Sequence, residues 1–156
     1  MEPLNIVFSR SSNPFAAAIR AYPPSGPYSH TSIWLPEKKI LIEALASKKG
    51  VVFTPEQEFR KRVSVAKLLS IDAPRVEQAN DWAESTEGDT YDWSYVFSIP
   101  FRVRDWQKEG SWACSEHCAM YCIKAGIDII APGMHGITPN HLYSLFYAAG
   151  AREQEF

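Results

Sequence analysis

The 156-residue chain contains few cysteines, almost no excess charge and no long hydrophobic run. Its three cysteines are clustered at Cys114, Cys118 and Cys122, whereas a secreted disulfide scaffold has an even number spread along the chain. The net charge of −2 offers no basic surface to nucleic acid or to an anionic membrane. No segment approaches the ~18 apolar residues that span a bilayer. These absences argue against a disulfide-rich domain, a membrane span and charge-driven nucleic-acid binding.

The N-terminal residues do not form a signal peptide pattern, because residue 2 is acidic and the following apolar run is short. We therefore expect a protein that acts in the reducing cytoplasm. The length suits one domain, residues 1–156, and the 46% hydrophobic and 13% aromatic content can fill a core. No motif indicates a cofactor, and the oligomeric state is left open.

The hydrophobic pattern predicts strands in the first half of the chain, at 4–8, 28–35, 39–46, 51–54 and 63–71. Helices are predicted at 15–21, 74–87, 91–97, 113–125 and from 138 onward. The acidic pair Glu56 and Glu58 is interpreted as a solvated turn. Strands followed by helices predict an α+β fold in which an antiparallel sheet packs against helices.

Cys114 is predicted to lie at the start of a helix, directly after a loop that contains Gly110. The free N–H groups of a first helical turn stabilise a thiolate and can also bind an oxyanion. Cys118 and Cys122 follow at steps of four residues and are expected to face the core. A small buried Cys114 without chemistry is the alternative.

A thiolate nucleophile needs a base, and His30 is the best placed of the four histidines. His30 and Glu43 lie on adjacent strands of a predicted hairpin, where an even loop length puts both side chains on one face within reach of each other. A carboxylate on an otherwise apolar face needs a partner. Glu43 is therefore predicted to orient His30, with a surface position as the alternative.

The other histidines are weaker candidates. His117 would lie on the same helix as the nucleophile, and His135 and His141 are expected at the surface. A metal site would need them to join the cysteines, but no CxxC or HExxH spacing is present, so no metal is expected.

These motifs and their order resemble the circularly permuted branch of the NlpC-type papain-like cysteine hydrolases, which includes YiiX/YaeF-like amidases and, more distantly, lecithin:retinol acyltransferase-type enzymes. The resemblance runs from His30 to Gly126, with Ile42-Glu43-Ala44, Tyr91-Asp92 and Cys114-Ser115-Glu116 between them. It implies a permuted papain-like fold, Cys114 as nucleophile, His30 as base and Glu43 as the residue that orients it. Tyr91 matches an aromatic residue that lines the cleft in relatives.

Tyr28 beside His30, and Trp112 and Ser115 beside Cys114, are added as predicted substrate contacts. The primary hypothesis is a cysteine peptidase or amidase that hydrolyses an amide or ester bond of a small-molecule, peptide or acylated substrate. An acyltransferase and a catalytically silent binding module of a phage or bacterial assembly stay open as alternatives.

Overall fold

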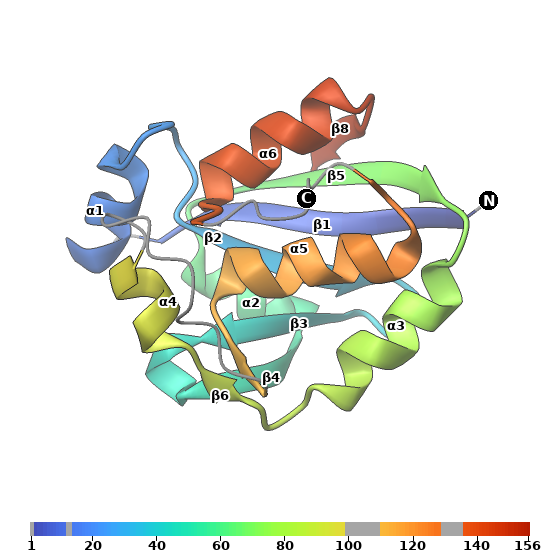
Figure 1. Ribbon diagram of the computed structural model, residues 1–156, viewed down its shortest axis with the longest axis horizontal. Helices are drawn as coiled ribbons and strands as arrows, with labels where there is room; N and C mark the ends of the chain where they lie inside the picture. Colours follow the sequence, from blue (N-terminus) through green and yellow to red (C-terminus); the bar gives the residue numbers. More distant parts are fainter. Residues whose placement is uncertain (1, 12–13, 99–109, 129–135) are drawn as a thin grey trace.

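The apolar runs of the first half of the chain form a curled sheet (Figure 1). The computed structural model describes residues 2–11, 14–98, 110–128 and 136–156. The strands are β1 (Glu2–Arg10), β2 (His30–Leu35), β3 (Ile40–Leu45), β4 (Gly50–Pro55), β5 (Val65–Ala73), β6 (Thr90–Tyr91), β7 (Ser111–Trp112) and β8 (Arg152–Glu155). The five predicted strands correspond to β1–β5 and are confirmed.

The strand order is β7-β6-β4-β3-β2-β1-β5-β8. All neighbouring strands pair in antiparallel fashion except β6 and β7, which are parallel. The prediction of an antiparallel sheet is therefore wrong in this detail, because the sheet is mixed. The α+β class itself is confirmed.

The helices occupy both faces of the sheet and one of its ends. They are α1 (Pro14–Ala21), α2 (Glu56–Arg62), α3 (Val76–Ser85), α4 (Trp93–Ser98), α5 (Cys114–Ala125) and α6 (Pro139–Ala148), with a 3₁₀ turn, η1, at Ala46–Lys48. All the predicted helices are present, with boundaries shifted by up to two residues. The predicted helix at 91–97 begins later, since Tyr91 belongs to β6.

The main core lies between the sheet and helices α3, α5 and α6. The sheet contributes large apolar side chains such as Phe8, Ile33 and Ile42, and α5 contributes small ones, including Cys118 and Cys122. Small residues let α5 approach the strands closely, so the helix lies against β2 (Figure 1). Its N-terminal residue is Cys114, as predicted.

The opposite face is covered by α2, so the prediction of a solvated turn at Glu56 and Glu58 is wrong. Glu56 and Glu58 instead occupy its first turn, and its last turn is basic, a distribution that suits the helix dipole. Phe59 is fully buried against Leu41 and Trp34. A seven-residue helix with a single apolar anchor shows no periodicity, which explains why the pattern missed it.

Helices α1 and α4 lie at the end of the sheet where α5 begins (Figure 1). Their exposed aromatic side chains meet there, with ring centroids of Phe15 and Trp93 5.8 Å apart. Within the part of the chain that the structure describes, no helix is both long and apolar enough to cross a membrane.

Gly50 lets β4 approach the chain just before β6. A Cβ at Gly50 would lie 2.1 Å from the backbone oxygen of Asp89.

We expect Gly50→Ala to lower the free energy of unfolding by about 2 kcal/mol or more, because β4 must move away. Urea unfolding measures this loss. Gly88→Ala is the comparison, because a Cβ there meets no atom of the described residues within 4 Å. Only the left-handed backbone of residue 88 should then lower the free energy of unfolding, by about 1 kcal/mol. Equal losses in the two variants would contradict the steric argument.

Candidate active site

The site forms where β2 and β3 separate. Backbone pairing between these strands runs from Leu35↔Ile40 to Ile33↔Ile42 and then stops. Beyond that point, the first residues of β2 and the last residues of β3 are no longer paired with each other. The N-terminus of α5 lies at this opening, because the backbone N–H of Thr31 donates a hydrogen bond to the sulfur of Cys114.

Side-chain alternation places His30 and Glu43 together. In the observed register they are diagonal neighbours on one face of the sheet, as the even hairpin loop predicts. Their side chains point to the face of Leu41, opposite the face that α5 covers. Without the opening between the strands, the sheet would separate them from Cys114.

The imidazole of His30 links the carboxylate to the thiol. Its Nε2 lies 2.9 Å from Oε1 of Glu43. The same ring interacts with the side chain of Cys114, and this interaction raises the pKa of His30. Because Nε2 faces the carboxylate, Nδ1 is the nitrogen available to the sulfur. The imidazole thus lies between the carboxylate of Glu43 and the thiol of Cys114.

Glu43 has no solvent exposure, and each of its oxygens is partnered. Oε1 accepts hydrogen bonds from His30 and from the hydroxyl of Ser32 at 3.1 Å, and Oε2 accepts from the guanidinium of Arg62. The hydroxyl of Thr54 also donates to the carboxylate. Burial alone raises the pKa of Glu43, but His30, Arg62 and Thr54 outweigh it and hold the pKa below its usual value.

The charge states of His30 and Cys114 depend on each other. Burial lowers the pKa of His30, but its hydrogen bonds to Cys114 and Glu43 outweigh this effect and raise the pKa to about 9. Burial raises the pKa of Cys114, but His30 and the N–H groups of Thr31 and Ser115 outweigh it and lower the pKa. Both shifts favour the thiolate–imidazolium form of the pair over the neutral form.

The other two thiols have the opposite environment. Burial raises the pKa of both Cys118 and Cys122. The Cys122 thiol donates to the carbonyl oxygen of Cys118, with sulfur and oxygen 3.0 Å apart. Both face the core, as predicted from the helical spacing.

A cleft of about 350 Å³ opens beside Cys114 and His30. Apolar side chains make up much of its wall, and Arg62 is the other cationic group that lines it. The lining residues are Ser9, Ser11, Phe15, Ala16, Ile19, Ser29, His30, Ala44, Leu45, Ala46, Ser47, Arg62, Val63, Tyr91 and Cys114. Tyr91 thus lies where the sequence analysis expects a substrate contact.

Tyr28 and Ser115 are not among the residues that line this cleft. Tyr28 is buried in the main core, with its ring centroid 4.8 Å from that of Tyr143. The hydroxyl of Ser115 donates to the backbone oxygen of Ile137. The Tyr28 ring packs in the core and the Ser115 hydroxyl is hydrogen-bonded to the backbone, so the structure gives no support for a substrate contact by either side chain.

Trp112 also points elsewhere. Its indole Nε1 donates to Asp89 Oδ2 at 2.8 Å, and its ring contacts Trp82 and His117. Burial lowers the pKa of His117 to about 3, so this imidazole is neutral. Its Nε2 lies 2.8 Å from the hydroxyl of Thr86. His117 is therefore a core residue.

His141 lies in the first turn of α6, where its backbone N–H donates to Thr138. His135 falls outside the described residues. Within the described ranges, no three or more His, Cys, Asp or Glu side chains are grouped so that they could hold a metal ion.

Sequence reasoning missed Arg62, Ser32 and Thr54. Arg62 ends the helix that was not predicted, and Ser32 shares the face of His30 because it lies two residues further along β2. One signal could have found them: a buried carboxylate needs several hydrogen-bond donors, so Glu43 had to have partners besides His30.

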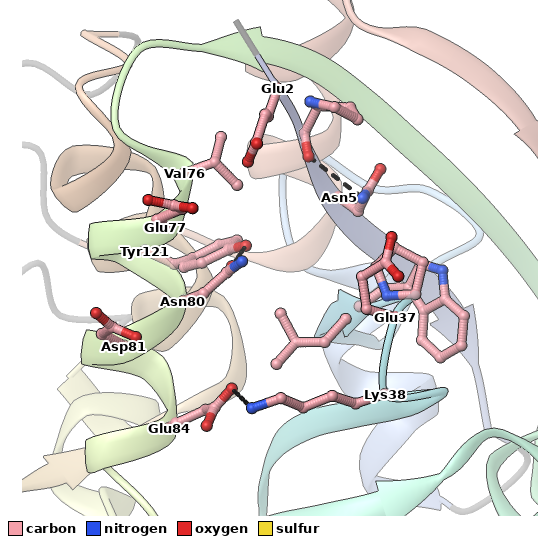
Figure 2. Close-up of a pocket in the computed structure, with 14 residues that line it drawn as sticks. Glu2, Asn5, Glu37, Lys38, Val76, Glu77, Asn80, Asp81, Glu84 and Tyr121 are labelled. Carbon is pink, nitrogen blue, oxygen red and sulfur yellow. Dashed lines mark hydrogen bonds and ion pairs between the residues drawn. The ribbon is translucent and has the colours of Figure 1, made fainter.

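A larger groove, of about 690 Å³, lies between α3 and the β1–β2 region. Figure 2 shows Glu77, Asp81 and Glu84 along α3, with Glu37 and Lys38 on the opposite side of the groove. Glu84 forms an ion pair with Lys38, and the described residues that line the groove include no cysteine or histidine. The smaller cleft is lined by Cys114 and His30, the predicted nucleophile and base, so it is the candidate active site.

Comparison of the chain with protein-family models, curated proteins and solved structures gives no match. The likeness to permuted NlpC-type hydrolases therefore rests on the sequence motifs alone and enters below as part of a proposal.

The three thiols should react selectively. At pH 6 an ordinary thiol of pKa ~8.5 is almost fully protonated. We expect iodoacetamide to alkylate Cys114 in the folded protein at this pH, and Cys118 and Cys122 only after unfolding. Peptide mass spectrometry gives the rate at each site, and Cys114→Ala should show no native-state reaction. Equal rates at all three sites would overturn the assigned environments.

Proposed function

We propose that this protein is a cysteine hydrolase that cleaves an amide or ester bond through an acyl-enzyme on Cys114. The observation that carries the proposal is the arrangement of Cys114, His30 and Glu43, in which the imidazole bonds the buried carboxylate and interacts with a thiol that lines a cleft. The resemblance to permuted NlpC-type hydrolases adds independent support, since its motifs select the same three residues.

The chemistry follows from the charge states. The Cys114 thiolate attacks the substrate carbonyl carbon and forms a C–S bond, and the carbonyl oxygen becomes an oxyanion. N–H groups of the first turn of α5 are the nearby donors for that oxygen. His30 then gives its Nδ1 proton to the leaving amine or alkoxide as the C–N or C–O bond breaks.

Water completes the cycle. Neutral His30 takes a proton from the attacking water, the thioester C–S bond breaks, and the carboxylic acid leaves. Thiolate and imidazolium are thereby restored. Glu43 keeps the ring oriented with Nδ1 toward the sulfur and stabilises its charged form, and it does not itself need to move a proton.

The first test identifies the nucleophile. We incubate the protein with a thiol-reactive, activity-based electrophile and measure its intact mass. The wild type should show one adduct and Cys114→Ala should show none. Cys122→Ala is the matched control, because it removes a thiol from the same helix and should keep the adduct. A protein that forms no adduct would instead be a silent binding module. Transfer of the acyl group to an added amine, rather than to water, would indicate an acyltransferase.

The second test separates the roles of His30 and Glu43. His30→Ala should slow acylation by a factor on the order of 10²–10⁴, because the thiolate loses its imidazolium partner and the leaving group loses its proton donor. Glu43→Gln keeps a hydrogen bond to the ring but removes the charge, so turnover should fall more than the melting temperature does. Stopped-flow acylation and thermal unfolding measure the two effects. If Glu43→Gln alkylates and turns over like the wild type, the site is a Cys–His dyad.

The pH dependence should follow the raised pKa of His30. Protonated His30 is needed to donate to the leaving group, so acylation by an amide substrate should decline as pH rises through about 9. Simple thiol alkylation needs only the thiolate and should not decline there. Measuring both rates from pH 7 to 10.5 checks this difference. A parallel decline of the two rates would contradict the proton-donor role.

A further inference from the structure

The buried carboxylate needs more than its histidine partner. His30 and Ser32 share Oε1 of Glu43, which leaves Oε2 to other donors. An ionised carboxylate without solvent contact is costly unless both oxygens are paired. The group that meets Oε2 therefore influences how firmly Glu43 keeps its charge.

That group is the guanidinium of Arg62, the last residue of α2. Its centre lies 5.3 Å from the ring centroid of the fully buried Phe59, a cation–π contact that holds it from a second side. The side chain is 38% exposed and lines the cleft, so it joins the buried carboxylate to the surface where substrate would bind.

We propose that Arg62 is a positioning residue, which keeps Glu43 ionised and thereby sets the pH range over which Cys114 is a thiolate. This inference rests on the proposed function. Arg62 acts through Glu43 and His30 and does not need to touch the reacting atoms. The sequence pattern did not predict Arg62 as part of the site.

Electrostatics gives the sign of the effect. Among the described residues, the charged or titratable groups in direct contact with Glu43 are His30 from β2 and Arg62 from α2. Cys118 of α5 interacts with Glu43 electrostatically, and Cys114 is linked to it through His30. Removing one positive charge from this set favours protonation of every member. The thiolate of Cys114 would then be lost at a higher pH than in the wild type.

Arg60 provides a matched control on the same helix. It pairs with Glu56 at 2.7 Å and lies 4.4 Å over the ring of Phe156, so its surroundings resemble those of Arg62. It differs in that its carboxylate partner is a surface residue of the same helix rather than the buried Glu43. Replacing Arg60 should leave the cleft unaffected.

The experiment measures iodoacetamide alkylation of Cys114 between pH 4 and 9 in the wild type, Arg62→Gln, Arg62→Lys and Arg60→Gln. In the wild type the alkylation rate should fall as the pH drops and the thiolate is protonated. In Arg62→Gln we expect this fall to occur about one pH unit higher, so that alkylation below it is roughly tenfold slower than in the wild type. Arg62→Lys retains the charge and should stay within about threefold of the wild type. Arg60→Gln should match the wild type.

The outcomes separate this inference from the proposed function. Suppose that the wild type is alkylated rapidly at pH 6 and that the rate–pH profile of Arg62→Gln coincides with it. This result overturns the role of Arg62 alone. A uniform slowing at all pH values, with a lower melting temperature, also overturns it, because that is a structural effect. A wild-type Cys114 no faster than an ordinary thiol overturns the proposed function, and the role of Arg62 with it.

Arg62→Gln could also fail to fold. The double variant Glu43→Gln/Arg62→Gln then decides, since it removes both charges. Recovery of folding in the double variant supports the pairing of Arg62 with an ionised Glu43. A double variant that stays unfolded shows that Arg62 is needed for packing on Phe59, and this overturns the inference.

Discussion

The carboxylate of Glu43 has no solvent contact, so the fold must supply every group that balances its charge. Those groups come from three separate elements: His30 and Ser32 from β2, Thr54 from β4 and Arg62 from α2. None of them can move far without leaving a buried charge unpaired. The register of the central strands, the position of α2 and the orientation of the imidazole are thus linked through one side chain.

The opening between β2 and β3 is the second requirement. A continuous ladder would place His30 and Glu43 on one face of the sheet and Cys114, with α5, on the other. Because the backbone pairing stops at Ile33↔Ile42, the first turn of α5 reaches the unpaired N–H of Thr31 and the ring of His30. The irregular part of the sheet is therefore the part that brings the thiol and the base together.

The sequence could predict those features that depend on local pattern. Strand alternation and an even hairpin loop placed His30 and Glu43 on the same face, and the Gly-containing loop before an apolar helix placed Cys114 at its start. The pattern could not identify α2, whose single buried side chain, Phe59, gives no period. Nor could it identify β8, whose four residues are all polar and exposed.

Substrate contacts were harder to predict, because neighbours in sequence need not face the same way. Tyr28 lies two residues from His30 but packs into the core, and Trp112 lies two residues from Cys114 but bonds Asp89. Tyr91, far from both in sequence, is the predicted contact that lines the cleft. Where a ring points depends on long-range packing, and that packing is not contained in sequence separation.

The three cysteines of α5 show which physical effects set thiol reactivity. All three are buried, on one helix and spaced by four residues, so neither burial nor the helix dipole alone explains their opposite pKa shifts. Cys114 differs in having an imidazole and two backbone N–H donors directed at its sulfur, whereas Cys122 has a carbonyl oxygen, which favours the protonated thiol. Desolvation acts on all three in the same direction, and specific hydrogen bonds reverse it at one position. The helix start matters here mainly because it leaves N–H groups unpaired at the point where the sheet opens.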